Sequence, residues 1–389
     1  MPLVNFDTSA QSNLTLYTTE RAVSQVHLQH STLPYTVIFK PTLASRTFLV
    51  SDETFAMFSL VVDDWICMFL AVVGAINNII CIVIFATQGF KDTVNITMTT
   101  IAFWEVMKLS CAIADRLAGP IKLFHVALGT SWKNIVVATI RYFQGICGNI
   151  SYMMAAYVAI ERSICVCFPF DVKRYFTPKL TAIICVSISI SVLGSLITVL
   201  FIFEIVWVYR EELSASVAVY QYSTFFHQHG AVFMNYYKLI AFFYPMISLF
   251  TMVVSTCIIT HQLQKSSRFR LKGLAPGSAQ GDLVSGVEGH GRARLTARDR
   301  QIVKLLLVLI SAYICNLTPR FVHFLTSLLV PEYYFLRLYN NIFWCVVYSV
   351  YVMDYLNSSS MLLIYFSMSS NFRETAKRIF HPPCPAMKL

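Results

Sequence analysis

The hydrophobic positions of the chain gather into long runs that short polar segments interrupt. Seven runs reach about 18 or more residues, the length that a helix needs to cross a bilayer. They lie at about 56–87, 94–118, 135–166, 179–208, 231–263, 298–330 and 338–369. The second and third runs are the weakest, because Lys108, Asp115 and glycine-rich stretches break them. The pattern predicts an all-α membrane protein built as a bundle of seven transmembrane helices.

The composition excludes a water-soluble fold. Hydrophobic residues make up 56% of the 389 positions and charged residues only 13%, whereas a soluble domain carries about 25% charged residues. One water-soluble core cannot hide so much apolar side chain, so we expect the lipid bilayer to be the solvent of the bundle.

Basic residues predict the orientation of the bundle. The net charge is +10, and three polar segments share most of the surplus of lysine and arginine. These residues are Lys173, Arg174 and Lys179; Lys265, Arg268, Arg270, Lys272, Arg292, Arg294, Arg298 and Arg300; and Arg373, Lys377 and Arg378. Basic loops stay cytoplasmic. With an odd number of spans, all three basic segments lie on the cytoplasmic face only if the amino terminus is outside and the carboxyl terminus is inside. No base-stacking platform accompanies these charges, so nucleic acid is not an expected partner.

The segments outside the spans have distinct patterns. Residues 1–55 form a polar outer tail, predicted to be disordered, in which Asn13 begins a glycosylation sequon. Residues 264–297 are rich in glycine and serine and predict a disordered inner loop. Residues 370–389 predict a short amphipathic eighth helix and a cytoplasmic tail, in which Cys384 is a candidate for S-palmitoylation. The apolar face of this eighth helix would contain Phe372, Ala376, Ile379 and Phe380.

Several polar side chains fall inside the predicted spans. An ionisable group in hydrocarbon costs about 2.5–3.5 kcal/mol by the lower estimates, so each of them needs a partner or a hydrated cavity. Besides Lys108 and Asp115, the ionisable residues that we single out are Glu105, Glu161, Arg162, Arg320 and Asp354, and the uncharged ones are Asn77, Asn78, Gln144, Ser151, Asn357 and Ser358. We treat these positions as the candidate functional residues.

At the end of the third run the sequence carries a motif that resembles the rhodopsin-like G-protein-coupled receptors. The resemblance covers about residues 56–380. Glu161-Arg162-Ser163 is followed at the family's spacing by Pro169 and Phe170. Further positions that match the family's motifs are Gly74, Asn78, Pro245, Pro319, Tyr365, Phe372 and Arg373, with Glu105 where the family has an aspartate. The resemblance implies a plasma-membrane receptor that binds an extracellular ligand. The string "NSSSMLLIYFSMSS" is most similar to orphan chemosensory and neuropeptide receptors of molluscs, so a peptide or a small chemosensory molecule is the expected ligand.

The sequence departs from the family at three motifs. The NPxxY motif reads Met361-Leu362-Leu363-Ile364-Tyr365, without its asparagine and proline, and Leu317 replaces the tryptophan of span six. The family's outer disulfide has neither end, because Val137 or its neighbours replace one cysteine and the loop at 209–230 holds none. We therefore expect that loop to be less tethered than usual.

The resemblance implies a switch at the inner end of the bundle. Arg162 would pair with Glu161 and with Asp299, and an opening of span six would expose a cavity for a heterotrimeric G protein; Tyr365 belongs to the same site. Pro169 and Phe170 would contact the G protein, and arrestin and membrane lipids are further implied partners. The simpler alternatives are that Arg162 only anchors a span at the membrane surface and that Pro169 and Phe170 form a loop turn.

The resemblance also implies two sites within the bundle. Glu105, Ser151, Asn357 and Ser358 align with a sodium pocket, and the alternative is a hydrated polar core without stable sodium. Gln144, Arg320, His323, Tyr351 and Asp354 align with the outer ligand site, although Arg320 and Asp354 could instead form an internal salt bridge. Gln144 stands where amine receptors have an aspartate, which disfavours a biogenic amine, and Tyr355 stands where opsins have the retinal lysine, which excludes a photopigment.

Two other function classes have less support. A polytopic transporter or channel is the alternative function, but no internal repeat of the kind found in many transporters is apparent. An intramembrane enzyme is not expected, because the sequence contains no HExxH motif, GxSxG motif or pair of catalytic aspartates. Apart from sodium, no cofactor is expected.

Overall fold

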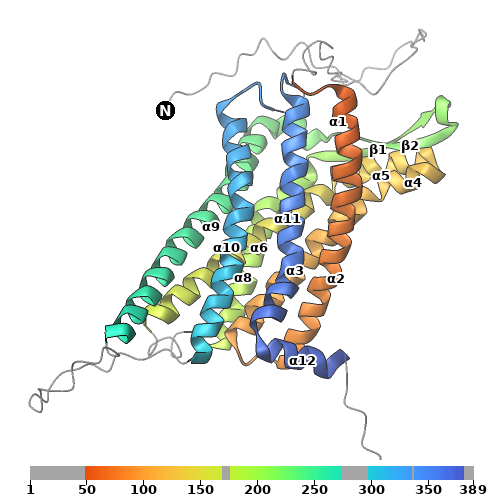
Figure 1. Ribbon diagram of the computed structural model, residues 1–389. Helices are drawn as coiled ribbons and strands as arrows, with labels where there is room; N and C mark the ends of the chain where they lie inside the picture. Colours follow the sequence, from red (N-terminus) through yellow and green to blue (C-terminus); the bar gives the residue numbers. More distant parts are fainter. Residues whose placement is uncertain (1–48, 169–175, 273–296, 335–336, 381–389) are drawn as a thin grey trace, which may run out of the picture.

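The computed structural model describes residues 49–168, 176–272, 297–334 and 337–380. Long helices run side by side in a bundle, with a β-hairpin at one end and the short helix α12 across the other (Figure 1). We call these two ends of the bundle the hairpin end and the α12 end. Within the described residues, six helical stretches are long and apolar enough to cross a membrane, and these are Asp52–Gln88, Thr93–Phe124, Ile140–Cys167, Pro178–Phe201, Asn235–Lys265 and Gln301–Leu329.

A seventh long helix completes the bundle. Helix α11 (Asn340–Met368) has 29 residues, or about 44 Å at 1.5 Å per residue, against a hydrocarbon core of about 30 Å. It packs between α2 and α10. Its interior face carries polar side chains, including Asp354 and Ser358. The predicted helical membrane bundle is confirmed.

The first span begins earlier than predicted. The Ser51 hydroxyl accepts a hydrogen bond from the backbone N–H of Thr54 and caps α1 (Asp52–Phe58). A π-helical segment, Ser59–Ile66, joins α1 to α2 (Cys67–Gln88). The wider π-turn buries Asp63 in the bundle, although its neighbours Val61 and Trp65 are exposed. Residues 52–55 of the predicted disordered tail are therefore helical.

The third span also differs from the prediction. Helices α3 (Thr93–Arg116) and α4 (Ala118–Phe124) lead into α5 (Val126–Ala138), and α6 (Ile140–Cys167) is a separate helix. The chain bends at Thr139, where φ is −128° and ψ is −70°. The predicted span at 135–166 was wrong at its start, because the apolar residues before Thr139 pack against the hairpin and give the same hydrophobic pattern as a membrane helix.

A β-hairpin replaces the end of the predicted fourth span. Helix α8 (Pro178–Leu196) and the 3-10 turn Ile197–Phe201 are followed by β1 (Phe203–Arg210), the turn Glu211–Leu213 and β2 (Ala215–Tyr222). The strands pair antiparallel from Phe203 opposite Tyr222 to Arg210 opposite Ala215. Hydrophobicity alone extended the helix prediction to residue 208, because a strand rich in aromatic and β-branched residues is equally apolar.

Two side chains of α5 hold the hairpin in place. Asn134 donates to the carbonyl oxygen of Ala218 at 2.7 Å, and the hydroxyl of Ser131 accepts from the Ala218 N–H at 3.1 Å. Ala218 is fully buried. Two hydrogen bonds to one buried residue therefore anchor the hairpin, and the expectation that this loop is less tethered than usual stays a prediction.

The remaining helices form the other side of the bundle. They are α9 (Thr224–Lys272), which contains Pro245, α10 (Ala297–Leu329), which contains Pro319, and α12 (Ser370–Phe380). Helix α9 continues to Lys272, so the first part of the loop predicted at 264–297 is helical. Phe372 and Ala376 of α12 are buried, as its amphipathic pattern predicts, whereas Phe380 at its end is exposed.

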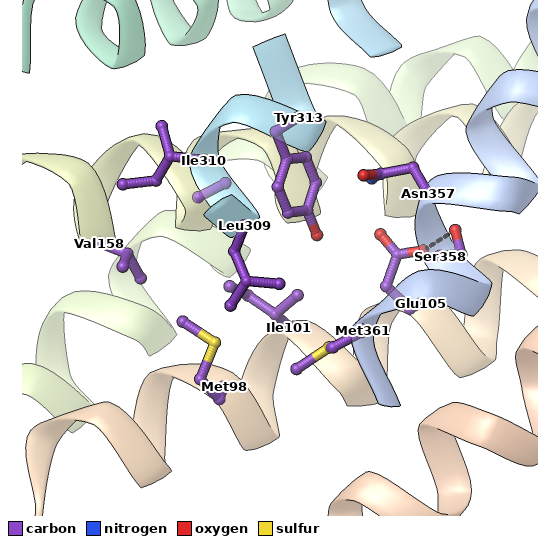
Figure 2. A pocket seen from close by; sticks show the side chains of 11 residues that line it. Met98, Ile101, Glu105, Val158, Leu309, Ile310, Tyr313, Asn357, Ser358 and Met361 are labelled. Atoms are coloured by element: carbon purple, nitrogen blue, oxygen red, sulfur yellow. Dashed lines mark hydrogen bonds between the residues drawn. The ribbon is translucent and has the colours of Figure 1, made fainter. Parts of the chain in front are cut away.

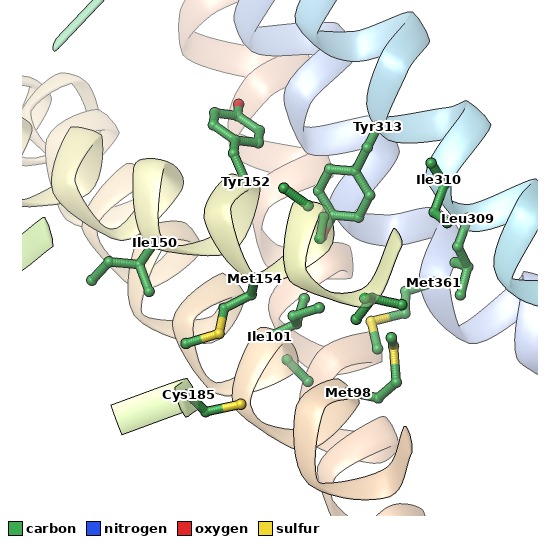
Figure 3. Close-up of a cluster of buried hydrophobic side chains, with 14 of the residues drawn as sticks. Met98, Ile101, Ile150, Tyr152, Met154, Cys185, Leu309, Ile310, Tyr313 and Met361 are labelled. Atoms are coloured by element: carbon green, nitrogen blue, oxygen red, sulfur yellow. The ribbon is translucent and has the colours of Figure 1, made fainter. Parts of the chain in front are cut away.

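Helix α6 is the centre of the bundle. In an apolar 18-residue stretch of α6, 67% of the residues are buried inside the protein. The corresponding fraction is 22% both in the span that contains α8 and in the span Asn235–Lys265 of α9. Figure 3 shows Ile150, Tyr152 and Met154 of α6 among side chains from α3, α8, α10 and α11. Large apolar side chains also face outward along the peripheral helices, for example Ile183, Leu239, Phe250 and Leu363. This outer apolar surface suits lipid.

Four sequence predictions fall outside the described residues. They concern Asn13, Pro169, Phe170 and Cys384. Glycosylation, palmitoylation and the role of the second inner loop therefore stay predictions.

Candidate functional site

The centre of the bundle contains a buried cluster of charged side chains. The ammonium Nζ of Lys108 lies 2.7 Å from Glu105 Oε2 and 3.1 Å from Asp354 Oδ1. Lys108 and Glu105 are three residues apart on α3 and therefore lie on the same face of that helix, and Asp354 comes from α11. All three side chains are at most 3% exposed. The cation thus bridges two carboxylates from two helices.

Asp354 is the most highly connected residue of the cluster. Its Oδ1 accepts hydrogen bonds from Lys108, from the Tyr152 hydroxyl at 2.9 Å and from Asn316 Nδ2 at 3.0 Å. Its Oδ2 lies 3.7 Å from Arg320 Nη2, which is an ionic contact too long for a hydrogen bond. Asp354 therefore joins α3, α6, α10 and α11, and it holds Lys108 more tightly than Arg320.

The other side of the cluster borders a cavity. Glu105, Asn357, Ser358 and the hydroxyl end of Tyr313 gather at one end of it, and apolar side chains line the rest (Figure 2). The Ser358 hydroxyl donates to Glu105 Oε2, while Oε1 has no partner among the described groups. The structure thus brings together three members of the predicted sodium set. The buried Ser151 hydroxyl makes no hydrogen bond within the described part of the chain.

A second buried ion pair lies nearer the hairpin end. The guanidinium of Arg116 on α3 pairs with the Asp63 carboxylate, and its Nε donates to the Asp63 carbonyl oxygen at 2.7 Å. Its Nη1 donates to the Ala112 carbonyl oxygen and to the Tyr355 hydroxyl. The predicted ligand residue Gln144 donates to the same hydroxyl at 2.7 Å. Tyr355 therefore connects Gln144 to the ion pair that fixes the first span.

The hairpin end also carries a more exposed charge cluster. Asp115 Oδ2 accepts from Arg141 Nη2 at 2.7 Å, and its Oδ1 lies 3.3 Å from Lys133 Nζ. The side chains of Arg141 and Lys133 are 28% and 42% exposed, whereas Asp115 is buried. Two cations thus share one carboxylate at this end of the bundle.

The other predicted ligand residues lie in aromatic surroundings. His323 Nδ1 is 2.9 Å from the Tyr333 hydroxyl, and its ring contacts Phe343 with centroids 4.8 Å apart. Burial raises the pKa of Tyr333, outside the spans, to about 12, so its phenol stays neutral at pH 7. Tyr351 stacks on Tyr355 at 6.1 Å. Of the five predicted ligand residues, the charged pair Arg320 and Asp354 is in direct ionic contact.

The predicted switch residues lie at the α12 end. Glu161 Oε1 accepts from Arg162 Nη2 at 2.8 Å and from the Thr93 hydroxyl at 2.6 Å. Both charged side chains are largely buried, but Glu161 Oε2 and Arg162 Nε make no hydrogen bond within the described residues. Asp299 belongs to the first turn of α10, and its pairing with Arg162 stays a prediction.

Aromatic packing holds α12 against the bundle. The Tyr365 ring lies 5.0 Å from Phe85 and 5.4 Å from Phe372. These rings line a second cavity, between α2, α3, α10, α11 and α12. Gln301 of α10, which also lines it, donates to the Met368 carbonyl oxygen at 2.8 Å. An outward movement of this end of α10 would break that bond.

Sequence reasoning missed several members of these clusters. Lys108 was treated only as an interruption of a span, although its spacing of three from Glu105 indicated a shared helix face. Thr93, Tyr152 and Asn316 carried no signal, because a buried hydroxyl or amide in a membrane helix has many uses. Asp63 lies within the apolar run of the first span, and the hydrophobic pattern gave no sign that its carboxylate is buried in an ion pair.

Comparison with protein families supports this reading of the bundle. A family model described as "7 transmembrane receptor (rhodopsin family)" matches residues 76–364, well over half of the chain. None of the curated protein sequences compared with the chain matches it. Within the described residues no group of three or more histidine, cysteine, aspartate or glutamate side chains is arranged to hold a metal ion.

Proposed function

Because the chain belongs to the rhodopsin family of seven-transmembrane receptors, we propose that it is a plasma-membrane receptor whose extracellular ligand activates a heterotrimeric G protein. The hairpin end faces outward, and the α12 end, with its basic residues, faces the cytoplasm. The observation that carries the proposal is the buried Glu161–Arg162 pair at the end of α6, in which Glu161 Oε2 and Arg162 Nε find no hydrogen-bond partner among the described groups.

This pair can act as a two-state element. In the inactive state Arg162 donates a hydrogen bond to Glu161, and the Thr93 hydroxyl donates a second one to the same carboxylate. In this proposal, Asp299 of α10 supplies a second carboxylate to the Arg162 guanidinium. Movement of α10 away from α11 breaks the Arg162–Asp299 pair and the Gln301–Met368 bond. Both changes open the α12 end to the carboxyl-terminal segment of a Gα subunit. A ligand shifts the equilibrium toward this open state only if it binds the open state more tightly than the inactive state.

The ligand chemistry follows from the charges at the hairpin end. Arg320 is 26% exposed, and its guanidinium has a single ionic contact within the described residues, with Asp354 at 3.7 Å. Asp354 is already held by Lys108, so Arg320 is the charge that is free to change partner. A peptide or small chemosensory molecule with a carboxylate would form a bidentate pair with it. A cationic amine is disfavoured at the position of Gln144, because that side chain is neutral and donates a hydrogen bond to Tyr355.

The test measures ligand-independent second-messenger production in cells, corrected for surface expression. Replacing Asp299 with Ala is expected to raise basal signalling roughly fivefold, if the lost pair contributed about 1 kcal/mol to the inactive state. Replacing Arg162 with Ala is expected to abolish coupling. Glu374→Ala removes an exposed carboxylate at the same end of the bundle and should leave signalling unchanged. Unchanged signalling in both the Asp299 and Arg162 variants, in a receptor with measurable basal activity, would contradict the proposed switch.

A further inference from the structure

The charged cluster at the centre of the bundle does not match the sodium pocket that the family resemblance implies. That pocket requires a carboxylate whose charge is free to attract a hard cation and oxygen ligands to surround the ion. In this protein Lys108 Nζ already lies 2.7 Å from Glu105 Oε2. We propose that the ammonium group of Lys108 is a tethered cation that takes the place of a sodium ion.

The charges of the cluster support this assignment. Glu105 and Asp354 carry two negative charges, and Lys108 and Arg320 carry two positive charges, so the cluster is neutral as it stands. A sodium ion would add an uncompensated charge to a buried site, which is costly in a low-dielectric interior. Without Lys108 the same cluster would carry a net charge of −1 and would attract a cation.

The position of Lys108 is built into the packing. Its aliphatic chain passes Gly148 of α6, where an added Cβ would lie 3.6 Å from Lys108 Cδ. The side chain is 2% exposed, so the ammonium cannot reach water and is held by the two carboxylates. A lysine on the surface of a span would instead extend its amine to the membrane surface.

The cavity beside Glu105 offers little to a free ion. Seven of its eleven lining residues are aliphatic or methionine side chains from α3, α6, α10 and α11, namely Met98, Ile101, Ala155, Val158, Leu309, Ile310 and Met361. Met361 stands where the family supplies an asparagine ligand. Glu105 Oε1 is the one carboxylate oxygen that faces this cavity without a partner among the described groups. Such a space suits a water molecule, which needs only two to four polar partners.

The experiment measures the thermal unfolding of the purified full-length receptor in detergent. A thiol-reactive fluorescent dye reports unfolding, because Cys67, Cys81, Cys147 and Cys185 are buried free thiols. The unfolding midpoint is compared in sodium chloride, potassium chloride and choline chloride at equal ionic strength, about 0.15 M. This readout needs neither ligand nor G protein, so it is independent of the proposed signalling function.

The wild-type protein is expected to unfold at the same midpoint in all three salts. The variant Lys108→Met is expected to be less stable in choline chloride and to gain several degrees in sodium chloride, with a midpoint that rises with the logarithm of the sodium concentration. Lys108→Arg keeps a cation in the cluster and should not respond to sodium. Lys304→Met removes an exposed lysine of α10 and controls for the loss of a surface charge.

A double variant tests the charge balance directly. Adding Asp354→Asn to Lys108→Met makes the cluster neutral again, so it should abolish the sodium response and restore part of the lost stability. If Lys108→Met does not fold, recovery of folding in the double variant supports the proposal, and the wild-type measurement still decides it. Specific stabilisation of the wild type by sodium would overturn the proposal. A folded Lys108→Met protein with equal midpoints in all three salts would overturn it as well.

Discussion

The buried pair between Asp63 and Arg116 is expected to stabilise the bundle by fixing the first span to α3. Both side chains are at most 7% exposed, and the guanidinium also contacts the Asp63 carbonyl, the Ala112 carbonyl and the Tyr355 hydroxyl. Asp63→Asn keeps the shape and removes the charge. Two unit charges about 4 Å apart interact by about 4 kcal/mol at an effective dielectric constant of about 20. Loss of one partner of a buried pair costs about 3–5 kcal/mol.

We therefore expect Asp63→Asn to lower the free energy of unfolding by about 3 kcal/mol, since Arg116 keeps its three other contacts. Arg116→Met leaves Asp63 buried without its partner and should cost a similar amount. The double variant should lose about 3–4 kcal/mol instead of about 6, because neither charge is then left alone; the coupling energy would be about 2–3 kcal/mol.

The assay is unfolding of the purified receptor by a denaturing detergent, followed by the loss of helical circular dichroism. Asp64→Asn is the matched control, because Asp64 is the next residue of the same π-helical segment and is only partly buried; it should cost less than about 0.5 kcal/mol. Additivity of the two single changes within about 0.5 kcal/mol would refute the reasoning, because the residues would then be stabilising the bundle independently.

Two further predictions concern single contacts. Gly74→Ala should destabilise the protein by about 1–3 kcal/mol in the same assay, since its Cβ would lie 2.9 Å from Ser359 Oγ; Gly194→Ala, with open space around it, should be neutral or stabilising, and equal effects at the two positions would contradict the packing argument. Thr93→Val should raise basal second-messenger production a few-fold by weakening the anchor of Glu161, whereas Thr93→Ser keeps the hydroxyl and should not; a rise in both variants would show that the hydrogen bond is not the cause.

The fold could be predicted from the sequence because bilayer thickness and hydrophobic run length are directly linked. The helices at the positions of spans six and seven begin and end within two residues of the predicted limits. The prediction failed at Thr139, where the membrane helix α6 begins, and near Phe203, where the chain has left a membrane helix, because hydrophobicity does not change at either point. A strand or a helix packed on protein is as apolar as one packed on lipid, so hydropathy carries no signal for that boundary.

The candidate site could be predicted only in part. The rule that an ionisable group in a span needs a partner selected Glu105, Arg320 and Asp354 as candidates, and it offered a salt bridge between Arg320 and Asp354 as one alternative, but it did not connect Glu105 to that pair. It did not supply the partners, because Lys108, Tyr152 and Asn316 reach Asp354 from three helices at long sequence separation. The sodium expectation relied on family positions alone. A residue three places from one of those positions can change the chemistry without altering the motif.

The tethered cation has a consequence for how the two ends of the receptor communicate. Contacts run without a gap from Arg320, in the proposed ligand site, through Asp354 and Lys108 to Glu105, and on to Ser358 beside the central cavity. Where the central cation can dissociate, its binding and release contribute to the coupling free energy between the sites, which then depends on ion concentration. A covalently attached ammonium removes that dependence. A ligand carboxylate that draws Arg320 away leaves Asp354 and Glu105 sharing one cation between two charges. The resulting excess negative charge would lie between α3 and α11, across the cavity from Leu309 and Ile310 of α10 (Figure 2). In the proposed switch, this change in charge would act on α10 without the family's NPxxY residues.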